Sequence, residues 1–208
     1  MQDFLMDGVS KIAGGEFAKF TADGVGTCTG EIKAESIKID GVFHCDGKVE
    51  TGSLCCDGVA EFKANVIAKK VHIDGVVSVK NGANMEGNEI TCDGLIEVSG
   101  EVSADILHVD GYINAAEIVG DKITICSRSK NAVANFFVRK HSKVQLIEAT
   151  TVELTGVKSK TVNGRDVVIG PHCKIENLDC CGTLFIHPTS AVAHITGNYT
   201  KMDEINEK

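Results

Sequence analysis

Tryptophan is absent from this sequence of 208 residues, and proline and arginine are scarce, with two and three residues. No run of about 18 apolar residues occurs, so no membrane-spanning helix is expected, and the first residues do not form a charged-then-apolar signal peptide. The sequence also lacks a glycine-rich phosphate-binding loop. We therefore expect a cytoplasmic protein that uses no cofactor.

Basic residues are outnumbered by acidic ones, 21 against 29, which gives a net charge of −8. Nucleic acid is disfavoured as the main partner, because its phosphates require a concentrated basic surface. No Gly-x-Ser-x-Gly nucleophile motif occurs, and the seven histidines never pair at metal-ligand spacing on one strand. The sequence therefore predicts neither catalytic nor metal-binding residues, and favours a protein that is not an enzyme.

Cysteine is present in an odd number, nine. Neither Cys55-Cys56 nor Cys180-Cys181 has the two-residue spacer that is typical of zinc sites. Four cysteines fall on the apolar positions of the repeat described next: Cys28, Cys45, Cys56 and Cys92. These patterns favour reduced thiols in a protein core over a disulfide framework.

A short unit of two or three mostly apolar residues followed by Asp-Gly recurs along the first half of the chain. Its aspartates follow one another at a nearly constant spacing, with a single longer step between the third and the fourth: Asp40, Asp57, Asp74, Asp93 and Asp110. Weaker copies precede them at Asp7 and Asp23. A fixed period of about 17 residues indicates structural units that stack on one another.

Apolar residues occupy the same places in each copy. They stand three and one residues before the aspartate, and two, five and nine residues after it. This alternation has a period of two, which is typical of strands. Asp-Gly suits a corner, since glycine adopts positive φ freely, and a second glycine often follows seven residues after the aspartate. The sequence predicts an all-β protein, a right-handed parallel β-helix with coils of about 17 residues.

The pattern divides the chain into four parts. Regular coils are expected over residues 1–126, a basic excursion over 127–143, further coils over 144–197 and a polar tail over 198–208. The one longer step, from Asp74 to Asp93, predicts an outward corner near residues 81–88.

The excursion contains five basic residues and no acid. Together with two phenylalanines they form a candidate membrane or partner patch: Arg128, Lys130, Phe136, Phe137, Arg139, Lys140 and Lys143. Two interpretations stay open. The segment is a solvated loop or short helix that covers the interrupted coil, or it is a surface for an anionic membrane or an acidic partner.

The aspartates also allow two interpretations. In stacked coils they would lie ~5 Å apart and repel one another. Each carboxylate could accept backbone N–H groups at its own corner, or the row could bind calcium, although the nonapeptide period of calcium-binding repeats is absent.

The two ends of the expected solenoid carry apolar residues and no convincing lid. Candidate assembly residues are Phe4, Met6, Val9 and Ile12 at one end, and Leu184, Phe185, Ile186, Val192 and Ile195 at the other. Open coils with unpaired backbone groups are templates for another chain. We therefore expect association between the ends.

The repeat, together with the stretches Val144-Gln-Leu-Ile-Glu-Ala149 and Arg165-Asp-Val-Val-Ile-Gly-Pro-His-Cys-Lys-Ile175, resembles the bactofilins, and in particular the longer variants of Gram-positive bacteria. The resemblance runs from about residue 7 to residue 197. It implies a polymer-forming bacterial cytoskeletal protein that needs no nucleotide, lies at the inner membrane face and helps to position envelope-building or motility machinery.

The alternative is a β-helix protein that binds or cleaves cell-wall polysaccharide. Clustered acids and aromatics in one external groove would favour that alternative. Flat faces with apolar ends would favour the scaffold.

Overall fold

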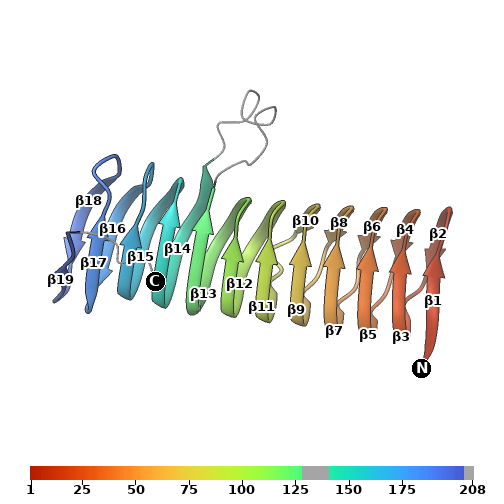
Figure 1. Cartoon of the computed structure of the whole chain (residues 1–208). Helices are drawn as coiled ribbons and strands as arrows, with labels where there is room; N and C mark the ends of the chain where they lie inside the picture. Colours follow the sequence, from red (N-terminus) through yellow and green to blue (C-terminus); the bar gives the residue numbers. More distant parts are fainter. Residues whose placement is uncertain (128–140, 204–208) are drawn as a thin grey trace.

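The computed structural model describes residues 1–127 and 141–203 as one elongated solenoid of parallel strands (Figure 1). It makes about 11 turns with a spacing of about 17 residues. In these two ranges there is no helix, and so none that could span a membrane. The predicted all-β parallel β-helix is confirmed.

Nineteen strands form the described solenoid. In chain order they are β1 (Gln2–Met6), β2 (Val9–Ile12), β3 (Gly15–Ala22), β4 (Val25–Cys28), β5 (Ile32–Ile39), β6 (Val42–Cys45), β7 (Val49–Cys56), β8 (Val59–Phe62), β9 (Val66–Ile73), β10 (Val76–Val79), β11 (Met85–Cys92), β12 (Leu95–Val109), β13 (Tyr112–Cys126), β14 (Ser142–Thr155), β15 (Val157–Ile169), β16 (Lys174–Cys180), β17 (Thr183–Ile186), β18 (Ala191–Thr196) and β19 (Thr200–Lys201).

Each early coil consists of a long strand and a short one, and each strand pairs in parallel with its equivalent in the next coil. Thus β5 pairs with β3 and β7, and β6 pairs with β4 and β8. From β12 to β15 the two strands of a coil merge into continuous strands of 13 to 15 residues. A residue therefore contacts its equivalent in the next coil, one period later in the sequence.

The core runs the length of the solenoid. Residues three and one before each aspartate are buried in the regular coils, as the alternation predicts; Ile37 and Ile39 are examples. At the N-terminal end the core is aromatic, with ring centroids of Phe20 and Phe43 5.3 Å apart and those of Phe43 and Phe62 6.4 Å apart.

The Asp-Gly corners owe their glycine to close stacking. Both Asp40 N–H and Gly41 N–H donate to Ala22 O of the preceding coil, at 2.9 and 3.1 Å. A Cβ on Gly41 would lie 2.0 Å from Gly24 O. Of the glycines that directly follow an aspartate of the repeat in the described chain, only Gly8 has positive φ, at 69°. The predicted explanation by positive φ is therefore wrong for the later corners.

The longer step between Asp74 and Asp93 is an exposed turn at Asn81 and Gly82, with φ of 61° and 73°, as predicted. Just after the turn, the side chain of Asn84 links this coil to the next one, since its Oδ1 accepts the N–H of Glu101 at 2.9 Å. The extra residues are thus absorbed outside the core.

The predicted boundaries shift slightly. β14 begins at Ser142, so the last two residues of the predicted excursion belong to a strand, and β19 lies within the predicted polar tail. The buried Ser142 Oγ accepts Ile113 N–H at 3.0 Å and lies 2.6 Å from Ser127 Oγ, which anchors both sides of the interruption. Of the predicted patch, Arg128, Lys130, Phe136, Phe137, Arg139 and Lys140 lie outside the described residues, whereas Lys143 is an exposed residue of β14.

Candidate functional site

The N-terminal end is an open coil in the described chain. β1 pairs with β3 only, and β2 pairs with β4 only, so one edge of each strand faces away from the solenoid. Phe4 and Ile12 are partly buried and pack on the core. The Phe4 ring stacks on Phe20 with a centroid distance of 5.7 Å and an interplanar angle of 12°. This end therefore presents an apolar cross-section.

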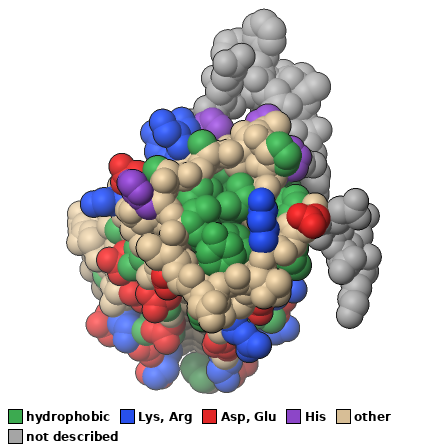
Figure 2. Space-filling view, turned by 90° about the vertical axis from the view of Figure 1, so that its left-hand side faces the viewer, with side chains coloured by type: hydrophobic (Ala, Val, Ile, Leu, Met, Phe, Trp, Pro, Cys, Tyr) green, Lys and Arg blue, Asp and Glu red, His purple; other side chains and the backbone are tan. Residues whose placement is uncertain are grey.

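The C-terminal end also exposes apolar side chains. Figure 2 views this end and shows a hydrophobic area at the centre of the cross-section, ringed mainly by backbone and by side chains that are neither hydrophobic nor charged. Ile186 and Val192 are partly buried against the core, and Ile195 of β18 is 38% exposed. β18 pairs with β16 only, among described strands.

Four predicted assembly residues are not exposed on an end face. Met6 and Leu184 are each only 2% exposed, and β19 pairs over Leu184. Val9 is 87% exposed but heads a row on the lateral surface that continues with Val25. Phe185 alternates outward between the inward Leu184 and Ile186, next to Val168 of the preceding coil. The structure thus leaves Phe4, Ile12, Ile186, Val192 and Ile195 as the end-face residues.

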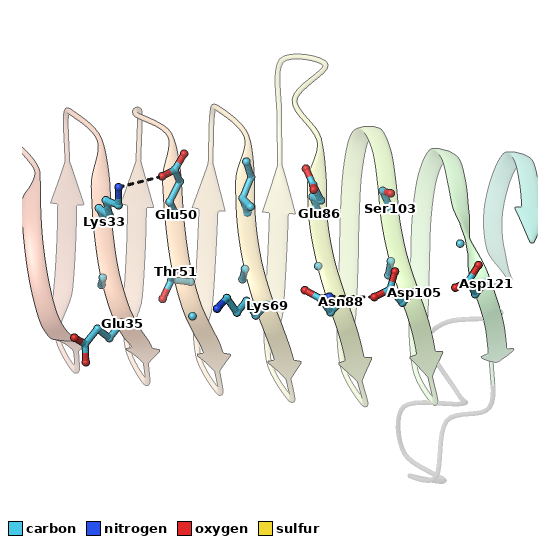
Figure 3. Close-up of a pocket in the computed structure, with 17 residues that line it drawn as sticks. Lys33, Glu35, Glu50, Thr51, Lys69, Glu86, Asn88, Ser103, Asp105 and Asp121 are labelled. Atoms are coloured by element: carbon cyan, nitrogen blue, oxygen red, sulfur yellow. Dashed lines mark hydrogen bonds and ion pairs between the residues drawn. The ribbon is translucent and has the colours of Figure 1, made fainter.

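A shallow groove of about 840 Å³ runs along the lateral surface of β5, β7, β9, β11, β12 and β13. Its floor is a row of small residues, one from each coil: Ala34, Thr51, Ala68, Gly87, Ala104 and Gly120. Longer side chains rise on both sides of the floor (Figure 3). This row was not predicted from the sequence, although a small residue eleven positions after most aspartates is its signal.

The groove is acidic. Glu35, Glu50, Glu86, Asp105 and Asp121 line it, and no aromatic residue occurs among its described lining residues. Glu50 accepts a hydrogen bond from Lys48 and lies 3.8 Å from Lys33 Nζ. The hydrogen bond from Lys48 lowers the pKa of Glu50, so this carboxylate stays ionised and is a poor general acid. Of the two features that would favour the polysaccharide alternative, the groove thus has the acids and lacks the aromatics.

Three aspartates of the row show two kinds of partner, the backbone of their own corner or a side chain two positions earlier. Asp7 accepts the N–H of Gly8 at 2.8 Å, as a corner cap should. Lys38 Nζ instead contacts Asp40 at 2.7 Å, and this hydrogen bond lowers the pKa of the carboxyl group. His72 Nε2 lies 3.3 Å from Asp74 Oδ1. The predicted backbone cap is therefore correct for Asp7, while the two later carboxylates have side-chain partners that the Lys-x-Asp and His-x-Asp spacing signals.

The described residues contain no group of three His, Cys, Asp or Glu side chains arranged to bind a metal ion. Cys28, Cys45, Cys56 and Cys92 are buried and form no disulfide, as predicted. Burial raises the pKa of Cys45, Cys56 and Cys92 to about 12, so these thiols stay protonated at neutral pH.

Comparison with known proteins gives one partial similarity. The chain is 44% identical over 48 residues to the uncharacterized protein YhbE of Bacillus subtilis (strain 168), and the match covers 23% of this chain and 20% of that protein. No family model matches the chain. No solved structure matches it either.

Proposed function

We propose that this protein is a structural scaffold that assembles end to end without nucleotide. The observation that supports the proposal is the pair of open coils, each with an apolar cross-section and strands paired on one side only among described residues. Joining two ends would satisfy the free backbone groups and bury both apolar faces. Because the coils stack through parallel strand pairs, strands joined at the ends could continue the stacking of the solenoid.

The resemblance of the repeat to bactofilins supports the same function. On this proposal the filament lies in the cytoplasm, at or near the inner membrane face, and positions envelope-building or motility proteins. The excursion would then be available to contact a membrane or a partner. No enzymatic activity is part of the proposal.

A charge on either end face should stop assembly. Phe4→Lys and Ile195→Lys place an ammonium group on the face that would be buried, where an unpaired charge is strongly unfavourable. Leu5→Lys is the matched control, because Leu5 neighbours Phe4 but is 60% exposed. We expect filaments or oligomers in negative-stain electron microscopy and light scattering for the parent and the control, and smaller species for both end variants.

Circular dichroism should give the same spectrum for all four proteins. If both end variants assemble as well as the parent, the contacts lie on the lateral surface and end-to-end assembly is wrong.

The acidic groove supports polysaccharide binding as a second candidate function. Its length across six strands would suit an extended glycan, and Asn88 Nδ2 donates to Asp105 Oδ2 at 3.0 Å on one wall. Incubation with purified peptidoglycan followed by sedimentation would test it. Binding that is lost in Asp105→Asn, while Ile195→Lys still binds, would favour this candidate over the scaffold.

A further inference from the structure

Three lysines stack in consecutive coils of the C-terminal half. Lys143 of β14 pairs with Lys158 of β15, which pairs with Lys174 of β16, so the three occupy one row along the solenoid axis. All three are exposed. Each stands about one coil after the previous one in the sequence, and the stacking of coils brings them to a spacing of ~4.8 Å.

The row forms one wall of a groove of about 430 Å³. The floor is the inward-facing row next to it, which includes Val144, Ser159 and Ile175. The opposite wall carries Lys160 and one acid, Glu176. The groove therefore has four positive charges and one negative charge in a chain whose net charge is −8.

This arrangement differs from the other lysine rows. In the N-terminal half, lysines contact acids one coil away. Lys33 and Lys70 lie opposite Glu50 and Glu89, at 3.8 and 3.5 Å. Lys80, which follows β10, lies 3.5 Å from Glu97. Lys143, Lys158 and Lys174 have no ion pair with any residue in the described ranges 1–127 and 141–203, and each faces another lysine. Like charges placed directly opposite destabilise a sheet, so an anionic occupant would relieve a repulsion that the fold leaves uncompensated.

We propose that this lysine groove binds a linear polyanion whose phosphate groups recur along one line. The charges lie along a concave path parallel to the axis, which fits a chain better than the flat surface of a membrane. Lysine presents a compact charge with three rotatable donors and suits single phosphate groups, whereas planar bidentate recognition would call for arginine. The floor is apolar apart from Ser159, whose hydroxyl already donates to Thr161 O at 2.9 Å, so charge would dominate the affinity.

The groove reaches the C-terminal coil, since Val192 also lines it, but the three stacked lysines lie on β14, β15 and β16 and project from the lateral surface, so their binding can be measured separately from end-to-end assembly. Long-chain inorganic polyphosphate is the probe, and calorimetric titration at several salt concentrations is the measurement. Four lysine contacts predict a slope of log affinity against log salt of about −3, at roughly −0.7 per phosphate in a single chain. Inorganic phosphate, which offers one group, should bind far more weakly.

The triple variant Lys143→Gln/Lys158→Gln/Lys174→Gln should lower the affinity for polyphosphate by on the order of 100-fold at low salt and flatten the salt slope to about −1. Lys33→Gln/Lys70→Gln/Lys80→Gln is the matched control, because it changes the net charge equally on acid-paired lysines. It should retain the affinity of the parent. Circular dichroism verifies that both variants fold.

Three results would overturn the assignment. The first is that the parent protein does not bind polyphosphate. The second is that both triple variants lose affinity equally, which would mean that binding reflects net charge alone. The third is that vesicles with anionic lipid bind through the same lysines while polyphosphate does not, which would make the surface a membrane contact.

Discussion

Replacing Gly58 with alanine would place a methyl group where the backbone of the preceding coil already lies. The added Cβ would be 2.1 Å from Gly41 O and 2.6 Å from Asp40 O, against 3.4 Å or more in ordinary contact. The side chain at this position cannot move away, because both contacted atoms belong to backbone. The two coils must therefore separate by about 1 Å at this corner.

That separation weakens two hydrogen bonds that join the coils. Gly58 N–H donates to Ile39 O at 3.1 Å, and Val59 N–H donates to Gly41 O at 2.9 Å. A net loss of about 1 kcal/mol for each bond, added to about 1–3 kcal/mol for the overpacked corner, predicts a destabilisation of about 3–5 kcal/mol. This is a large part of the stability of a typical domain, which is roughly 5–15 kcal/mol.

Gly82 provides the control. It has φ of 73° and its added Cβ would meet nothing within 4 Å, so alanine there costs only the left-handed conformation, about 1–2 kcal/mol. Asparagine tolerates that conformation and should restore part of the loss at residue 82, but not at residue 58. Urea unfolding followed by circular dichroism gives the free energies. Since a solenoid can open locally, exchange of the Val59 amide hydrogen serves as a second measure.

The reasoning is refuted if Gly58→Ala costs no more than Gly82→Ala. It is equally refuted if Gly58→Asn is tolerated, because the corner would then depend on backbone conformation and not on close stacking.

Three further outcomes are expected. Asp57→Asn removes repulsion within the aspartate row, so the melting temperature should stay level or rise; a calcium-dependent melting shift in the parent that shrinks in this variant would contradict the interpretation. The hydrogen bond from Lys63 lowers the pKa of Asp46. The stabilisation from this pair is therefore complete above the ordinary carboxyl pKa of about 3.9 and is lost as the pH falls through the lowered value. Lys63→Gln should unfold at a slightly lower temperature than the parent at neutral pH, and this difference should vanish in thermal melts at acid pH. An alkylating reagent at neutral pH should modify the exposed Cys181 before the buried Cys56, as peptide mass spectrometry would detect; equal rates would mean that the coil opens.

The fold could be predicted because its defining contact is periodic. A residue pairs with its equivalent one period later, so a strict period in the sequence fixes which strands are neighbours before any side chain is placed. Ile37 and Leu54 stand one period apart, pair directly and occupy the same buried row. The insertion between Asp74 and Asp93 was also visible, since it lengthened one step and left the spacing on either side unchanged.

The inward side of the short strands was harder to predict. The valines two residues after the aspartate, such as Val25 and Val59, are 46% and 43% exposed. The buried row lies one residue later and alternates in size, with Phe43 between Gly26 and Ala60. A Cβ on Gly26 would lie 3.0 Å from the Phe43 ring, so the large side chain requires the small one. Because large and small side chains pack against each other in this row, its positions do not repeat one residue type. An alignment of the copies therefore does not reveal the row as a buried one.

The surface rows follow from the same stacking, and they explain why the candidate sites were only partly predicted. On a helix, residues three or four positions apart in the sequence are neighbours, so a surface site lies within one short segment of the sequence. Here Lys143 and Lys158 become neighbours across a whole coil, after an interruption has already broken the period. A surface site on this fold therefore consists of equivalent residues from successive coils, which form one row along the solenoid axis. The charges of the residues in that row determine what the site can bind. The lysine row is unusual because the alternation of acid and base seen between Lys70 and Glu89 is replaced by repetition of one sign. Repetition of one charge sets a row apart from its neutralised neighbours, and that is the physical reason to look for an anionic occupant there.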